Sequence, residues 1–139
     1  MEKKQSHLEM IQGVVNRLSH NSFLLKGWSV VLISAFFALA ANNTKVFFIY
    51  LAYFPAISFW VLDGYFLQQE RLFRELYDYV RGLEEDKIDF SMNTRIVKDK
   101  VESWRRIVFS ITLLIFHGTV FGAILIVMLI VNYLTKGGT

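Results

Sequence analysis

The pattern of hydrophobic and polar positions divides the chain into three long apolar runs separated by polar segments. The middle run, residues 46–66, contains a single charged side chain, Asp63. A helix of roughly 20 apolar residues crosses the hydrocarbon core of a bilayer. Comparable runs occupy residues 23–41 and 107–134. The pattern therefore predicts three transmembrane helices. The third is longer than a bilayer requires, so it must tilt or project past the others.

Residues 1–22 form a segment whose apolar side chains recur at helical spacing. Ser6 and Glu9 have the spacing of a capping box, which predicts that a helix starts at Ser6. Such an amphipathic helix can lie on the membrane surface or pack against residues 67–84. Its polar face is not strongly basic, which favours packing. The apolar face consists of Leu8, Ile11, Val14, Val15 and Leu18.

The second apolar run passes directly into a charged helical segment, with no cluster of Pro or Gly between them. One seam of mostly apolar residues crosses this junction at alternating spacings of three and four, the a and d spacing of a coiled coil. A helix that keeps such a stripe in water must bury it against another helix. We expect the seam to hold helices or subunits together, with copies of this chain as the favoured partners. The seam residues are Phe59, Leu62, Phe66, Gln69, Phe73, Leu76, Val80 and Leu83.

The polar segments predict the connections and the orientation. Residues 42–45 read as a tight turn, which makes the first two spans an antiparallel hairpin. Residues 67–106 read as a helical region, with a connection after Leu83 and a second helix that starts near Asn93 or Thr94. Nine of the 15 Lys and Arg residues lie between Gln68 and Arg106. The positive-inside rule therefore predicts a cytoplasmic N-terminus, a cytoplasmic 67–106 region and an external C-terminus.

The third run contains the one ionisable residue near the middle of a span, His117. Ionisable residues inside a membrane are rare and are candidates for function. Ser103, Ser110 and His117 recur every seven residues, so on one continuous helix they share a face. Two interpretations remain open. Neutral His117 forms a hydrogen bond with a neighbouring helix, which is the favoured interpretation, or Ser110 and His117 line an aqueous pore.

Two further features concern helix contacts. Gly118 and Gly122 form a GxxxG motif, which predicts close helix packing either within or between subunits. Asp63 lies where the second span meets the cytoplasm. Lys26, Arg105 and Arg106 lie at the same depth, so each of these membrane-boundary charges is a candidate partner for its carboxylate.

The composition narrows the possible functions. The chain has 139 residues, 54% of them hydrophobic, a net charge of +3 and no cysteine. Its basic residues lie beside apolar spans, which indicates contact with anionic lipid rather than with nucleic acid. There is no phosphate-binding loop, nucleophile elbow or metal-ligand spacing. We therefore expect no enzyme activity, no cofactor, no metal and no nucleic-acid partner, and membrane lipids as the immediate surroundings.

Two stretches carry a resemblance to a known family. Residues 59–77, FWVLDGYFLQQERLFRELY, and residues 21–28, NSFLLKGW, are similar to a pattern in small bacterial membrane proteins. The chain resembles the RipA-family octameric membrane protein group, most clearly over residues 8–77. The resemblance implies a ring-like homo-oligomer in the bacterial inner membrane. It also implies a role in antiviral defence, beside genes for TIR domains or nucleotide signalling, as an effector that permeabilises the cell.

The sequence thus predicts an all-α membrane protein with three transmembrane helices. The second continues into a long cytoplasmic helix, and an amphipathic helix precedes the first. Two functions fit this architecture. The first is a homo-oligomeric membrane effector, a regulated pore or membrane-disrupting protein that responds to a cytoplasmic protein or a nucleotide signal. The second is a non-conducting membrane anchor or scaffold that recruits a soluble partner through its cytoplasmic helices.

Overall fold

The structure, a computed structural model, describes residues 1–43 and 46–138 and is all-helical over these residues. The predicted turn at residues 42–45 includes residues 44 and 45, which lie outside the described residues. The elements in chain order are α1 (Glu2–Asn43), α2 (Phe47–Arg81), the 3₁₀-helices η1 (Glu85–Lys87) and η2 (Thr94–Lys100), α3 (Trp104–Val108) and α4 (Ile111–Gly137).

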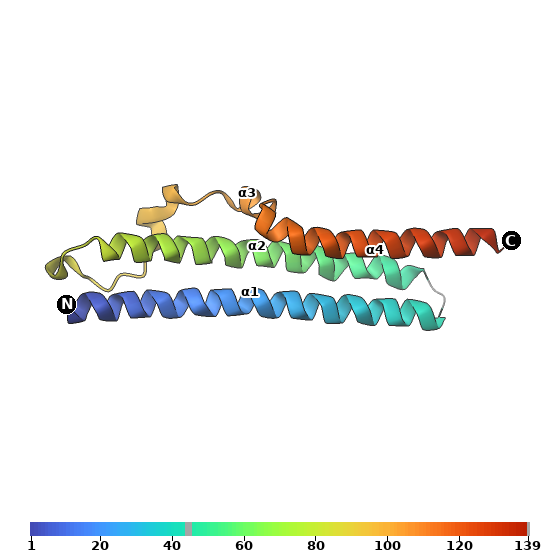
Figure 1. Cartoon of the computed structure of the whole chain (residues 1–139), viewed down its shortest axis with the longest axis horizontal. Coiled ribbons are helices and arrows are strands. Elements are labelled where there is room, and N and C mark those ends of the chain that lie inside the picture. Colours follow the sequence, from blue (N-terminus) through green and yellow to red (C-terminus); the bar gives the residue numbers. More distant parts are fainter. Residues whose placement is uncertain (44–45, 139) are drawn as a thin grey trace.

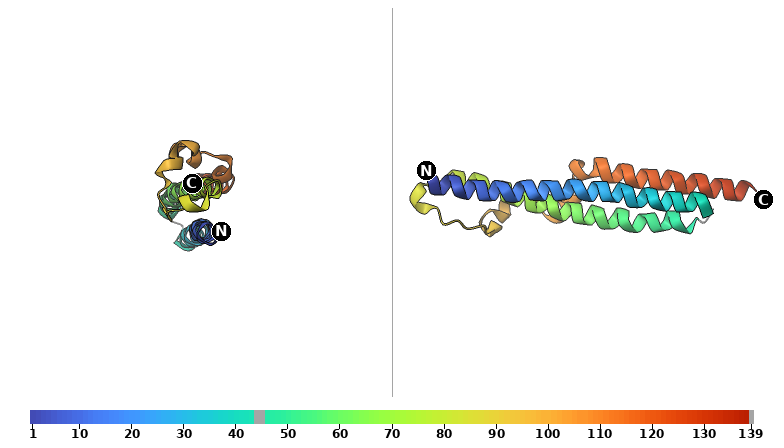
Figure 2. Two further views of the ribbon diagram at one scale, coloured as in Figure 1. Left: turned by 90° about the vertical axis from the view of Figure 1, so that its left-hand side faces the viewer. Right: turned by 90° about the horizontal axis from the view of Figure 1, so that it is seen from below.

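The molecule is elongated, with α2 between the two other long helices (Figure 1). Helices α1 and α2 form an antiparallel hairpin along almost the whole length of the molecule. Helix α4 packs along the first half of α2 and projects past the end at which α2 begins, as Figure 1 and the right-hand view of Figure 2 show. The segment from η1 to α3 returns along the second half of α2. Helices α1, α2 and α4 are each long and apolar enough to cross a membrane.

Helix α1 is one continuous helix, where the sequence predicts an amphipathic helix over residues 1–22 and a separate span over residues 23–41. Its start at Glu2 also precedes the predicted cap at Ser6. The helix starts this early because Glu85, which is distant in the sequence, caps its first turn. One carboxylate oxygen of Glu85 lies 2.8 Å from the backbone nitrogen of Lys3 and 3.4 Å from that of Lys4. These amides would otherwise lack partners in the first turn of a helix.

The amphipathic face of α1 packs against the second half of α2, which confirms the interpretation favoured from the sequence. Ile11 of α1 and Leu76 and Val80 of α2 are almost fully buried there. Ile88 and Val97 from the segment after α2 close this first core. The predicted second helix near Thr94 is the 3₁₀-helix η2, and the side chain of Asn93 accepts a hydrogen bond from the backbone amide of Arg95 at its start.

The predicted seam along α2 is divided between two environments. Leu76 and Val80 belong to the first core, and Phe73 and Leu83 pack against it, so this half of the seam is covered by the chain's own α1 and return segment. In the other half, Phe59 and Phe66 are partly buried and Leu62 is 44% exposed. The Phe73–Leu83 half of the seam therefore joins helices of one chain, which is one of the two contacts expected of it, and the contact between copies stays a prediction.

A second core lies in the apolar half of the molecule. Ile33 of α1, Ile49, Ala52 and Ala56 of α2 and Ile124 of α4 are buried together. Ala52 and Ala56 are small and one turn apart, which allows neighbouring helices to approach α2 closely. Helix α2 runs without interruption through Pro55.

The third apolar run begins with two helices instead of one. The sequence predicts a single span over residues 107–134, whereas α3 ends at Val108 and α4 spans Ile111–Gly137. Ser103 and Ser110 have extended backbone and stand at the N-caps of α3 and α4. Serine is common at N-caps, although neither of these two side chains accepts a hydrogen bond from the helix that follows it. The predicted common face of Ser103, Ser110 and His117 is therefore wrong, because the helix is interrupted.

Candidate functional site

Asp63 is the centre of a polar cluster that joins the three long helices. Its side chain is fully buried, on the side of α2 that faces both neighbours. Oδ2 lies 2.6 Å from Nζ of Lys26 on α1 and 2.7 Å from Nε2 of His117 on α4. The hydroxyl of Ser22 on α1 donates a hydrogen bond to Oδ1. One carboxylate therefore accepts from side chains of two different helices.

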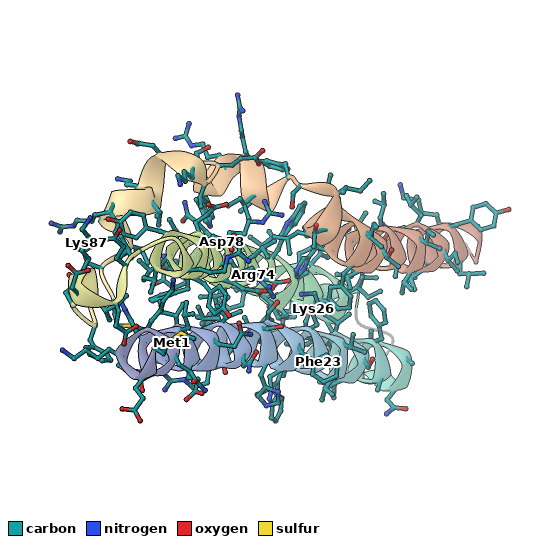
Figure 3. The ribbon with its side chains drawn as sticks, turned by 60° about the vertical axis from the view of Figure 1, so that its left-hand side comes forward. Met1, Phe23, Lys26, Arg74, Asp78 and Lys87 are labelled. Carbon is teal, nitrogen blue, oxygen red and sulfur yellow. The ribbon has the colours of Figure 1, made fainter. Side chains whose placement is uncertain are left out.

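The two residues from α1 lie one helical turn apart and contact each other. Nζ of Lys26 donates a hydrogen bond of 2.9 Å to the Ser22 hydroxyl, so the ammonium contacts both the carboxylate and the group that donates to it. The side chain of Lys26 extends from α1 toward the neighbouring helices (Figure 3). It retains 26% exposure, because its stem reaches the cluster from the edge of the helix pair.

Aromatic rings enclose the cluster on the α4 side. The indole of Trp60 stacks on the imidazole of His117, with 5.8 Å between ring centroids and 5° between planes. Nε1 of Trp60 donates a hydrogen bond of 2.9 Å to the carbonyl of Val108, in the last turn of α3. Phe116 lies under the ammonium of Lys26, 5.9 Å from the ring centroid. The rings limit the access of water and hold the imidazole toward Asp63.

Gly64, beside Asp63, allows α3 to approach α2 closely. A Cβ at this position would lie 2.5 Å from Cγ2 of Val108 and 3.2 Å from Nε1 of Trp104. No real pair of carbon atoms tolerates the shorter distance. Gly64 is therefore required by packing, and it keeps the α3–α4 junction against the helix that carries the carboxylate.

The arrangement combines one acid, one cation and one imidazole in a water-poor setting. The pairing of the Asp63 carboxylate with the Lys26 ammonium offsets part of the large cost of burying either charge. A carboxylate only accepts hydrogen bonds, so the N–H group at Nε2 of His117 donates the hydrogen bond to Asp63. Chemically, such a cluster links the charge of one carboxylate to the packing of three helices.

The structure brings together some of the residues selected from the sequence and separates others. Of the three candidate partners of Asp63, Lys26 contacts it, whereas Arg105 and Arg106 are exposed on α3. His117 is 1% exposed and forms its hydrogen bond with a neighbouring helix, as in the favoured interpretation. Ser110 stands at the start of α4, and its buried hydroxyl has no partner among the described residues.

The GxxxG motif lies on the side of α4 that faces away from α2. A Cβ added at Gly118 or Gly122 would meet no atom within 4 Å. The residues of α4 that pack on α2 or are buried, such as His117 and Ile124, lie on the other side of the helix. The close contact that the motif predicts is therefore not made within the described chain.

Ser22 and Trp60 are among the members of the site that were not selected from the sequence. Ser22 lies four residues before Lys26, and Trp60 lies three residues before Asp63. Both spacings place the side chain on the same helical face as its charged neighbour. A search for polar or aromatic residues one turn from each membrane-boundary charge would have found them.

The fold and the site together are compatible with a multi-pass membrane protein. No family model, curated protein or solved structure matches the chain. The ring-like assembly and the defence role implied by the resemblance to RipA-family proteins therefore stay predictions.

Proposed function

We propose that this chain is a homo-oligomeric effector of the bacterial inner membrane, a regulated pore without enzymatic activity, which the Asp63 cluster keeps closed. Helices α1, α2 and α4 would span the bilayer, and the large apolar side chains that they expose would contact lipid. Phe23, Phe54 and Ile115 are examples, with exposures of 72%, 76% and 68%. Side chains of this kind would be unfavourable in water in such numbers.

The buried cluster of Asp63, Lys26 and His117 carries the proposal. A charged side chain in the middle of a bilayer costs about 2.5–3.5 kcal/mol on insertion scales, and less near the edge. A simple anchor has no need of these groups, because apolar residues pack the same space at no such cost. In the present arrangement the polar atoms face one another, which leaves apolar surface on the outside of the bundle. Such an arrangement supports a closed state.

Opening would follow from separation of the three helices at the cluster. A carboxylate, an ammonium and an imidazole would then face outward and would require water. Three helices are too few to surround a hydrated channel, so several copies must contribute to it. Gly118 and Gly122 favour association through α4, because their side of the helix permits close approach of a second copy.

The distribution of Lys and Arg supports an orientation with the N-terminus and residues 67–106 in the cytoplasm. The trigger would act on this side, on the first core around Ile11 and Leu76 or on the return segment. The resemblance to RipA-family proteins adds antiviral defence as the biological setting, and a cytoplasmic protein or a nucleotide signal as the trigger.

The test uses a variant that bypasses the unknown trigger. Asp63→Asn keeps the shape of the side chain and removes the charge that holds Lys26. We expect proteoliposomes with this variant to release ions or dye severalfold faster than those with the wild type. Asp78→Asn is the matched control, because Asp78 is exposed on the same helix and pairs with Arg81 at the surface. If Asp63→Asn stays helical and its proteoliposomes leak no faster than those with the wild type or Asp78→Asn, the Asp63 cluster does not keep a pore closed.

A non-conducting scaffold is the second candidate, and one observation favours it. The first core gives the chain a packed region beyond the apolar halves of the helices, with Leu76 and Val97 each 1% exposed. Such a region is a rigid platform for a soluble partner. Tight liposomes for every variant, together with capture of one cytoplasmic protein that depends on residues 82–103, would favour the scaffold over the pore.

A further inference from the structure

An apolar groove of about 400 Å³ lies where α2, α3 and α4 meet. It is separate from the Asp63 cluster, although Trp60 borders both. Almost all of its lining is apolar. From α2 it is lined by Ile57, Trp60 and Val61, and from the end of α3 and from α4 by Val108 and Phe121. Ile57 and Val61 are one turn apart and are 51% and 41% exposed, so the groove opens along the outer surface of α2.

Arg105 is the single charged residue that lines the groove. Its side chain is exposed, and its guanidinium makes no hydrogen bond or ion pair with any residue that the structure describes. Lys26 of the Asp63 cluster, by contrast, is paired with a carboxylate. An unpaired guanidinium at the end of an apolar groove is complementary to a phosphate that is attached to a hydrocarbon chain.

The aromatic residues place the groove at the edge of the bilayer. Trp60 and Trp104 both line it, and tryptophan is enriched where acyl chains meet headgroups. Asp63, one turn after Trp60 on α2, ends the apolar half of that helix. The groove would therefore open toward lipid, with Arg105 at the level of the headgroups.

We propose that this groove binds an anionic phospholipid, with the phosphate on Arg105 and one acyl chain along Ile57, Val61 and Phe121. A headgroup that carries net negative charge is preferred, because in a zwitterionic lipid the choline ammonium competes with Arg105 for the phosphate. The inference rests on the membrane insertion of the proposed function. It goes beyond that function because it places one bound lipid at the α3–α4 junction, which packs against α2, the helix that carries Asp63.

Tryptophan fluorescence tests the proposal directly. The chain contains three tryptophans, and Trp28 on α1, which is 60% exposed, would be quenched by bulk lipid. In a Trp28→Phe background, both remaining tryptophans line the groove. We would reconstitute the full chain in vesicles and replace ordinary lipid stepwise by brominated phosphatidylglycerol or by brominated phosphatidylcholine. We expect the apparent affinity for phosphatidylglycerol to be roughly fivefold higher than that for phosphatidylcholine. One Arg near an anionic surface strengthens binding by about this factor.

Three substitutions distinguish a binding site from a general attraction to anionic lipid. Arg105→Gln should abolish the preference, whereas Arg106→Gln, which removes the same charge beside the groove, should preserve it. Val61→Phe should also abolish the preference, because it fills the groove and leaves Arg105 in place. Equal quenching by both lipids in the parent protein, or equal effects of the two Arg substitutions, would overturn the proposal. Absence of quenching by either lipid would instead overturn membrane insertion, and with it the proposed function.

Discussion

Nε2 of His117 lies 2.7 Å from Oδ2 of Asp63, the same oxygen that lies 2.6 Å from the ammonium of Lys26. One atom of α2 is thus the meeting point of α1 and α4, two helices that otherwise share little contact. The apolar contacts of the second core pair each outer helix with α2. The carboxylate therefore determines how the three helices sit relative to one another at this depth.

The Asp63–Lys26 pair should be strongly coupled. Removal of one partner leaves the other charge buried, so Asp63→Leu or Lys26→Met alone should each cost about 3–5 kcal/mol of unfolding free energy. The double variant should cost less than the sum of the two, with a coupling energy in the range of about 0.5–3 kcal/mol. Unfolding by denaturant in detergent micelles, followed by circular dichroism, measures the double-mutant cycle.

A second ion pair on α2 serves as the control for this cycle. Glu70 and Arg74 are 2.8 Å apart at i,i+4 spacing, and Arg74 is 59% exposed. An exposed pair of this kind contributes about 0.3–0.5 kcal/mol. If the coupling of Asp63 with Lys26 is no larger than that of Glu70 with Arg74, the cluster does not hold α1 to α2.

Gly64→Ala should loosen the contact between α2 and α3. The added methyl group would overlap Cγ2 of Val108, and the resulting shift should cost about 1–3 kcal/mol, typical of overpacking. The fluorescence of Trp104 should change with it, since its indole lies beside the same position. Gly13→Ala on α1 is the control, because a methyl group there meets no atom within 4 Å and should stabilise the helix by up to about 1 kcal/mol. If Gly64→Ala and Gly13→Ala are equally stable, α3 does not approach α2 closely at Gly64.

Leu76→Asp should unfold the part of the molecule around the first core. Leu76 is 1% exposed, so the variant loses about 1.5–3 kcal/mol of apolar burial and also buries a charge without a partner. Hydrogen exchange should then accelerate in residues 1–20 and 82–103, while the apolar half of α4 stays protected. Tyr79→Asp is the control on the same helix, since Tyr79 is 42% exposed and the change there should have little effect. If Leu76→Asp instead dissociates an oligomer and hydrogen exchange is not faster, Leu76 lies at an interface between subunits.

The parts of the fold that follow from local sequence could be predicted. The apolar runs within α1, α2 and α4 identify the helices, because length and hydropathy alone decide whether a helix can span a bilayer. The approach of Lys26 to Asp63 also follows from local information. Both lie at the same end of an apolar run, and a buried carboxylate needs a cation nearby.

The parts that depend on distant contacts could not be predicted. The cap of α1 is Glu85, more than 80 residues away, so the local signal at Ser6 was misleading. The break before α4 falls at Ser110, where the backbone is extended, and no Gly or Pro beside it marks the interruption in the sequence. The contact of His117 with Asp63 depends on the packing of α4 against α2, which no local pattern specifies.

The contact between Glu85 and the start of α1 should make that helix end sensitive to acid. A hydrogen bond from the N-terminal ammonium, 2.7 Å away, and those from the amides of Lys3 and Lys4 hold the pKa of Glu85 below its ordinary value of 4.5. A carboxyl group with a lowered pKa in the folded state binds protons more readily when unfolded. Its stabilising effect is therefore fully present above pH 4.5 and is lost as the pH falls through the lower, folded value.

The amide signals of Lys3 and Lys4 in micelles should report this loss by NMR. On acidification, both should shift together toward the positions of a frayed helix end, with a midpoint below 4.5. The amide of Ile11, two turns into the helix, should shift little. Glu85→Gln should give frayed signals at all pH values, because a neutral amide oxygen is a weaker partner for the ammonium and for the positive end of the helix. Signals of Lys3 and Lys4 that titrate identically in the wild type and in Glu85→Gln would show that another group caps α1.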